Sequence, residues 1–169
     1  MKKYTHKGTD LYISEEVFNQ AGLDYIKKPG TYLETLLSDI FYTRQDLKQY
    51  IDLYGKLNKL DRMAVIYAHG GQSFLGWTLY DGKDGERPIP AQRLVNRLDG
   101  KYSALILLSC NEATQTPKSK RSLLVVPDSI IYGAINPRDV SFDLIVPGTG
   151  IVGSDTIEYE IEQLRQRAS

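Results

Sequence analysis

The sequence contains one cysteine, Cys110, and only two histidines, His6 and His69. A lone cysteine excludes an intrachain disulfide and supplies too few thiolates for a cysteine zinc site. Lys plus Arg and Asp plus Glu both number 21, so the chain lacks the basic surplus that is typical of nucleic-acid binders. We therefore expect no metal, no cofactor and no nucleic-acid partner.

Long apolar runs are also missing. No segment approaches the roughly 18 apolar residues of a membrane-spanning helix. The basic residues near the start of the chain are not followed by the apolar region of a signal peptide. These absences predict a cytoplasmic protein without a membrane partner, and they leave the oligomeric state open.

The rest of the composition is typical of a globular protein. Of the 169 residues, 41% are hydrophobic and 25% are charged, and there is no low-complexity tract or internal repeat. A chain of this length is about the size of one ordinary domain. We therefore assign residues 1–169 to a single domain.

Apolar patterning alternates between strands and helices along the chain. Two short aliphatic runs, Met63–Ala68 and Ser103–Leu108, fit strands buried on both faces of a parallel sheet. Further strands are predicted at Leu123–Val126, Ser129–Ile135 and Phe142–Val146, helices at 31–57, 90–98 and 156–167, and a hairpin at 74–89. The predicted fold is an α/β three-layer sandwich with a mostly parallel central sheet.

The two central strands are each followed by a residue suited to nucleophilic catalysis. His69 with Gly70 and Gly71 follows the first run, and Cys110 follows the second, with 110 − 69 = 41 residues between them. That separation is about what a helical crossover between neighbouring parallel strands needs. Because loops at the carboxyl ends of such strands gather at one edge of the sheet, we expect the two side chains to meet there.

A cysteine and a histidine in contact form a dyad with a defined chemistry. The thiolate of Cys110 is the nucleophile, while the His69 imidazole lowers the thiol pKa and later protonates the leaving group. The amides of Gly70 and Cys110 are candidates to polarise the scissile carbonyl. In the alternative interpretation, Cys110 is a small buried apolar residue and His69 a structural residue at a strand end.

At these residues the chain resembles the caspase-like cysteine peptidases, which include caspases, legumain, separase, gingipain and the CHAT domains. The shared pattern is an apolar strand ending in His-Gly and a second one ending in a small residue and Cys, here V-I-Y-A-H-G-G and L-I-L-L-S-C-N. The resemblance covers about residues 63–135. It implies a caspase-like fold and thiol-protease activity on a polypeptide substrate without a cofactor, with His69 as general acid/base, Cys110 as nucleophile and Gly70 in the oxyanion hole. This chain has Ser109 before the cysteine where many relatives have Ala.

Two further features bear on substrate choice and processing. An acidic residue, Glu112 or Asp128, is a candidate to select a basic side chain before the scissile bond by charge pairing. The basic segment Thr114–Ser122 is interpreted either as a solvated connector or, by the resemblance to caspases, as a processing site.

A glycine motif near the C-terminus competes with this interpretation. Gly148, Gly150 and Gly153 match G-x-G-x-x-G, but a dinucleotide site also needs a second strand and an acidic residue about 20 positions further on. We interpret the motif as a glycine-rich turn, with nucleotide binding as the alternative.

Three functional hypotheses result. The first is a cysteine endopeptidase that forms an acyl-enzyme through the dyad. The second is a non-catalytic caspase-like interaction module in which Cys110 is structural. The third is a cysteine-dependent amidase or other hydrolase on a related sheet.

Overall fold

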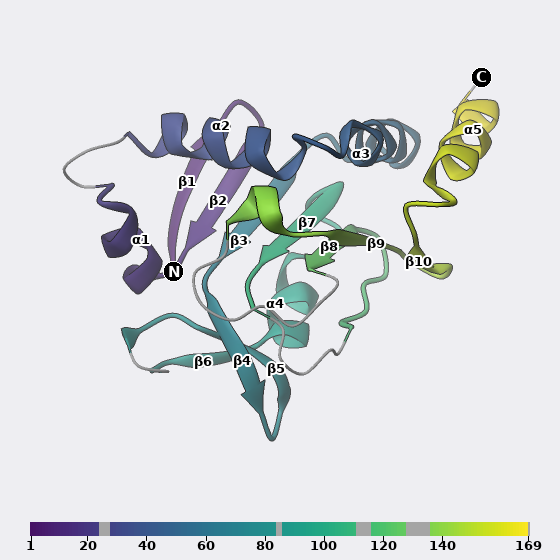
Figure 1. Ribbon diagram of the computed structural model, residues 1–169. Coiled ribbons are helices and arrows are strands. Elements are labelled where there is room, and N and C mark those ends of the chain that lie inside the picture. The colour runs from purple at the N-terminus through teal and green to yellow at the C-terminus, as the bar shows by residue number, and fades with distance from the viewer. Residues whose placement is uncertain (24–27, 84–85, 111–115, 128–135, 169) are drawn as a thin grey trace.

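The computed structural model describes residues 1–23, 28–83, 86–110, 116–127 and 136–168. A seven-stranded sheet with the order β1-β2-β3-β7-β8-β9-β10 forms its centre (Figure 1). The strands are β1 Lys2–His6, β2 Thr9–Ile13, β3 Met63–Tyr67, β7 Ala104–Leu108, β8 Leu123–Pro127, β9 Phe142–Val146 and β10 Gly150–Val152. β2, β3, β7 and β8 are parallel, whereas β1, β9 and β10 pair antiparallel at the two edges. The fold is therefore α/β with a mixed sheet that is mostly parallel in its middle.

The central strands are apolar throughout because both of their faces are covered. Every residue of β7 and β8 is buried. Successive side chains of a strand point to opposite faces, so Ile106 and Leu108 join one hydrophobic core while Leu105 and Leu107 join another. A run without polar alternation is what burial on both faces requires.

Helices cover both faces of the sheet. The first core receives the apolar faces of α1 Glu15–Ala21, α2 Pro29–Ile40, α3 Gln45–Asn58 and α5 Ile157–Ala168. The second core receives α4 Ala91–Leu98 and an antiparallel sheet of β4 His69–Ser73, β5 Gly76–Tyr80 and β6 Pro88–Pro90. A short 3-10 helix, η2 Pro137–Asp139, precedes β9. Figure 1 shows α2 and α3 above the central sheet and α4 with the small sheet below it.

Most of the predicted elements are confirmed. The strands at 63–68, 103–108, 123–126 and 142–146 and the helices at 31–57, 90–98 and 156–167 are present within a residue or two of their predicted bounds, with 31–57 divided into α2 and α3. Ser129–Ile135 lies outside the described residues. β1 was not predicted, because its sequence K-K-Y-T-H is too polar and short to show a strand pattern.

The glycine motif is a turn, as predicted. It joins β9 to β10, which pair antiparallel, and both Gly148 (φ +76°) and Gly150 (φ +101°) adopt the left-handed backbone that favours glycine. A dinucleotide-binding loop instead connects a strand directly to a helix. The nucleotide alternative is therefore wrong for this segment.

The basic segment predicted as a solvated connector is tied to α4. Its described part, residues 116–122, is largely exposed, yet Gln92 both donates to the Lys118 carbonyl and accepts from the Lys118 amide, each at 2.7 Å. The Asp99 carboxylate, which follows α4, accepts hydrogen bonds from the backbone amides of residues 120–122 at 2.5–3.0 Å. These bonds fix the described part of the segment against the body of the protein.

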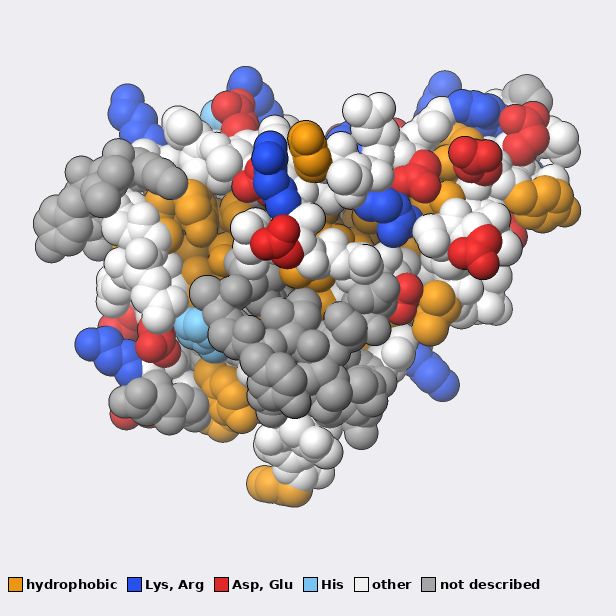
Figure 2. All heavy atoms as spheres, viewed as in Figure 1, with side chains coloured by type: hydrophobic (Ala, Val, Ile, Leu, Met, Phe, Trp, Pro, Cys, Tyr) orange, Lys and Arg blue, Asp and Glu red, His pale blue; other side chains and the backbone are white. Residues whose placement is uncertain are grey.

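None of the described helices is long and apolar enough to cross a membrane. On the face drawn in Figure 2, positive and negative side chains are interspersed, so the coloured, described residues of this face form no basic stripe. Apolar side chains mark the tip of the hairpin between β4 and β5, where Phe74 is 96% exposed.

The carboxylate of Asp99 gives a test of this arrangement. Burial favours its neutral form, but the amides of residues 120–122 outweigh that effect and hold the pKa of Asp99 below its ordinary value of 3.8. A depressed pKa stabilises the fold above the unfolded-state pKa, and this contribution is lost as the pH falls through the folded-state pKa. We expect Asp99→Asn to lower the free energy of unfolding by about 2 kcal/mol at pH 7, with the difference shrinking below about pH 4. Urea unfolding against pH measures this.

The matched control is Asp61→Asn, because Asp61 is exposed and has no hydrogen-bonded partner among the described residues. If Asp99→Asn lowers the free energy of unfolding no more than Asp61→Asn does, or by an amount that does not depend on pH, Asp99 does not hold residues 120–122 in place.

Candidate functional site

The candidate site lies at the carboxyl ends of β3 and β7. These strands are parallel neighbours, as the sequence predicts, with Tyr67 opposite Leu108 as the last pair. The Ala68 amide donates to the Leu108 carbonyl at 3.3 Å, which extends the pairing by one residue. His69 follows Ala68, and Cys110 follows two residues after Leu108, so the two side chains leave the sheet at the same edge.

His69 differs from prediction in one respect. It is not in a loop but is the first residue of β4, which pairs with β5 through His69 and Tyr80. The chain thus passes from the central sheet into the small sheet within one residue, Ala68. Backbone pairing on both sides of Ala68 leaves little freedom at the position of His69.

His69 and Cys110 line one cavity of about 220 Å³. The other lining residues come from α1, from α2 and from the end of β3: Val17, Gln20, Ala21, Tyr32, Tyr67 and Ala68. Cys110 is 6% exposed. The structure thus places both predicted catalytic side chains at one concave site.

The His69 ring is oriented by an amide from α1. His69 Nε2 lies 3.0 Å from Gln20 Oε1. Because an amide oxygen only accepts, Nε2 is the protonated nitrogen in this arrangement, which leaves Nδ1 as the basic nitrogen. Gln20 was not predicted as a site residue, since nothing in its spacing links it to His69, 49 positions away.

Gly70 is required by close packing against the cysteine segment. A Cβ at Gly70 would collide with Ser109 Oγ and with the backbone carbonyl oxygen of Cys110. The sequence suggested a role for the Gly70 amide in polarising the scissile carbonyl, and the structure shows in addition that the Gly70 backbone packs closely against Cys110 itself. Its role in an oxyanion hole stays a prediction.

The Cys110 backbone is held from the small sheet as well. The indole Nε1 of Trp77, in β5, donates to the Cys110 carbonyl at 2.9 Å in a buried hydrogen bond. Next to it, Ser109 is fully buried, and its hydroxyl has no hydrogen-bond partner among the described residues. Ser109 does not line the cavity, so we assign its hydroxyl no part in the chemistry.

Two tyrosines, Tyr32 and Tyr67, line the same cavity as the cysteine. Burial raises the pKa of Tyr32, and a hydrogen bond with Tyr67 adds to the effect. Burial also raises the pKa of Tyr67. The hydrogen bond with Tyr32 lowers the Tyr67 pKa, whereas the negative charge of a Cys110 thiolate raises it further. Both phenols are therefore neutral near pH 7.

The first turn of α1 is fixed to the end of β3. The Ser14 amide donates to the Tyr67 carbonyl at 2.9 Å, and the Ser14 hydroxyl caps the helix by accepting from the Val17 amide at 3.3 Å. Ser14 is fully buried. This junction sets the position of Val17 and Gln20 in the cavity wall.

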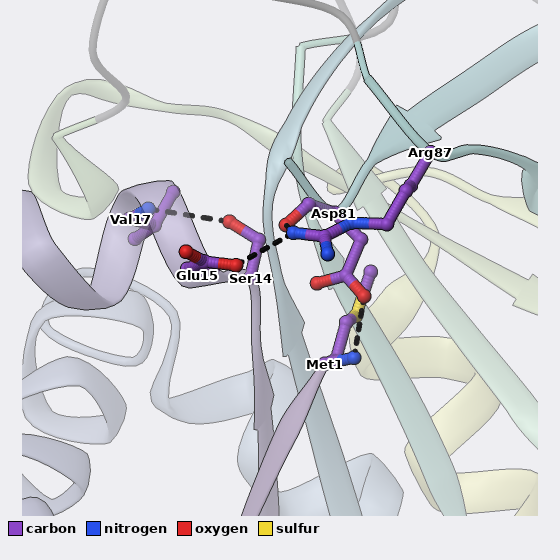
Figure 3. A network of polar contacts seen from close by, with 6 residues as sticks. All are labelled: Met1, Ser14, Glu15, Val17, Asp81 and Arg87. Atoms are coloured by element: carbon purple, nitrogen blue, oxygen red, sulfur yellow. Dashed lines mark hydrogen bonds and ion pairs between the residues drawn. The ribbon is translucent and has the colours of Figure 1, made fainter. Parts of the chain in front are cut away.

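Polar contacts with residues between β5 and β6 also hold the first turn of this helix (Figure 3). The Glu15 amide donates to the Asp81 carbonyl at 3.3 Å, and the Glu15 carboxylate pairs with Arg87 at 2.6 Å. The α-ammonium group of Met1 pairs with the Asp81 carboxylate, also at 2.6 Å. Because exposed pairs such as Arg87–Glu15 add at most about 1 kcal/mol, we assign this network mainly a positioning role.

The proposed selectors of a basic side chain, Glu112 and Asp128, lie outside the described residues. Among the described residues, no group of three His, Cys, Asp or Glu side chains forms a potential metal site. A second cavity, of about 420 Å³, lies at the amino ends of the parallel strands and is lined by Lys7, Lys48, Lys56 and Lys59 among others. It contains neither His69 nor Cys110, so it is separate from the candidate site.

In comparisons with known proteins, no family model matches the sequence, and no curated protein and no solved structure matches the chain. The resemblance to caspase-like peptidases therefore depends on the two strand-end motifs.

The packing of Gly70 predicts a large effect of one methyl group. We expect Gly70→Ala to lower the free energy of unfolding by about 2–3 kcal/mol, because the backbone of Cys110 must move to admit the Cβ. Gly153→Ala is the control, since a Cβ there meets no atom within 4 Å. Chemical denaturation of both variants tests this, and equal effects would show that the close approach is absent.

The buried hydroxyl of Ser109 predicts that its removal does not destabilise the fold, unlike the substitution of Gly70. We expect Ser109→Ala to leave the free energy of unfolding unchanged or to raise it by up to about 1 kcal/mol, since no hydrogen bond is lost. Ser122 is equally buried, but its hydroxyl donates to the Tyr102 carbonyl at 2.7 Å and accepts from the Gly100 amide at 2.9 Å. Ser122→Ala should therefore cost about 1–3 kcal/mol. A comparable loss for Ser109→Ala in thermal or urea unfolding would contradict this account.

Proposed function

We propose that this protein is a cysteine endopeptidase with a caspase-like fold, in which Cys110 and His69 form the catalytic dyad. The observation that carries the proposal is that both side chains line one cavity at the carboxyl ends of two paired parallel strands. Ligand sites of α/β sheets gather at this end of the strands. The strand-end motifs V-I-Y-A-H-G-G and L-I-L-L-S-C-N support the same assignment.

The proposed reaction has two steps. Cys110 Sγ attacks the scissile carbonyl carbon and forms a C–S bond, while protonated His69 gives its proton to the departing amine as the C–N bond breaks. His69 then removes a proton from water as the water oxygen bonds to the thioester carbon, and the C–S bond breaks to release the carboxylic acid and restore the Cys110 thiolate with protonated His69. The amides of Gly70 and Cys110 are the candidate donors to the oxyanion. No step needs a metal or cofactor, and a reducing compartment such as the cytoplasm suits the thiolate.

A second candidate is a non-catalytic interaction module. It is favoured by the 6% exposure of Cys110, since buried cysteines often serve only as small apolar residues. The third hypothesis, an amidase, is distinguished by comparing the rates of hydrolysis of peptides and of small amides. Faster hydrolysis of peptides favours the peptidase, and faster hydrolysis of small amides favours the amidase.

The dyad is tested by the pH dependence of Cys110 alkylation. We expect the rate of iodoacetamide labelling to follow an apparent pKa at least about 1 unit below the 8.5 of an ordinary thiol. In His69→Ala the midpoint should return toward 8.5, because the imidazolium that stabilises the thiolate is gone.

His6→Ala is the matched control, because His6 contacts Glu34 at 2.9 Å and is absent from the cavity lining. It should leave the labelling profile unchanged. Labelling that occurs only after denaturation, or identical profiles for the wild type and His69→Ala, would exclude the dyad and support the interaction module.

A further inference from the structure

The lining of the cavity bears on which substrates the proposed peptidase accepts. Besides His69 and Cys110, it consists of small or apolar residues, two tyrosines and one amide. None of the described lining residues carries a carboxylate, an ammonium or a guanidinium group. Apart from the Cys110–His69 pair itself, the described lining therefore offers no counter-charge to an acidic or a basic side chain.

The described lining other than His69 and Cys110 also stays uncharged near neutral pH. The hydroxyl groups of Tyr32 and Tyr67 share a hydrogen bond, and burial keeps both phenols protonated. Gln20 is neutral, and its side-chain oxygen accepts from His69. A charged side chain entering this space would lose water without gaining an ion-pair partner from the described lining outside the Cys110–His69 pair, which is unfavourable.

The size of the cavity limits its occupant to about one residue. Its volume of about 220 Å³ is below the roughly 300–1,000 Å³ of pockets that hold drug-sized ligands. The lining includes the small side chains of Ala21 and Ala68 as well as the larger ones of Val17, Tyr32 and Tyr67. These walls offer apolar contact to an aliphatic or aromatic side chain.

We propose that this cavity binds the side chain of the residue immediately before the scissile bond, P1, and selects an uncharged one of leucine to phenylalanine size. Cys110 lines the cavity and attacks the carbonyl of that same residue, so the P1 side chain is the one nearest to the nucleophile. The inference rests on the proposed peptidase function. It also differs from selection of a basic residue by Glu112 or Asp128, since the described lining provides no carboxylate.

The test compares acyloxymethyl ketone peptides that differ only in P1: Leu, Phe, Asp or Lys. Their second-order rates of covalent attachment to Cys110 are measured by mass spectrometry, with iodoacetamide as a reagent that has no P1 side chain. We expect the Leu and Phe probes to react at least about 30-fold faster than the Asp and Lys probes, because the charged groups must lose their water on entry.

A carboxylate placed in the wall should change this order. Ala21 lies at the end of α1 and is partly exposed, which leaves room for a charged side chain there. In Ala21→Asp we expect the rate of the Lys probe, relative to that of the Leu probe, to rise at least about tenfold, because the new carboxylate pairs with the lysine ammonium. Asn19→Asp is the control, because Asn19 lies on the same helix but does not line the cavity; it should leave the order of rates unchanged.

The outcomes separate this inference from the proposed function. If the Asp or Lys probe is fastest, or if all four rates are equal, while iodoacetamide labelling still depends on His69, the peptidase stands and the neutral P1 pocket is wrong. If neither the probes nor iodoacetamide react in a His69-dependent way, the proposed function fails and the inference fails with it.

Discussion

The parallel pairing of β3 with β7 determines where the two candidate catalytic side chains lie. The register that places Tyr67 opposite Leu108 brings the following residues of both strands to the same edge of the sheet. A shift of one residue in this register would turn the core-facing side chains of one strand toward the wrong layer. The same apolar burial that stabilises the fold therefore also fixes the spacing between His69 and Cys110.

That these two strands are parallel neighbours could be predicted from the sequence, because the signals are local and repetitive. Runs such as M-A-V-I-Y and A-L-I-L-L identify strands covered on both faces, and the length between them requires a crossover, here built from β4 to β6 and α4. His69 and Cys110 were found because each follows such a run. The overall α/β class and most of the helices follow from the same periodic signals.

The remainder of the site could not be predicted, because it depends on how elements far apart in sequence are rotated and stacked. Gln20 and Tyr32 reach the cavity from α1 and α2, and only the packing of those helices decides which of their side chains face Cys110. The transition of His69 into β4 was also missed, since H-G-G-Q-S has no strand pattern. Its strand conformation is imposed by pairing with β5 rather than by its own propensity.

The bond between Trp77 and the Cys110 carbonyl gives the molecule an optical reporter. Trp77 is the only tryptophan in the chain, and it is 3% exposed. Its indole N–H contacts the peptide unit of the candidate nucleophile at 2.9 Å. All of the protein's tryptophan fluorescence therefore originates from one ring beside Cys110, so events at the cysteine can be followed by emission without an added label.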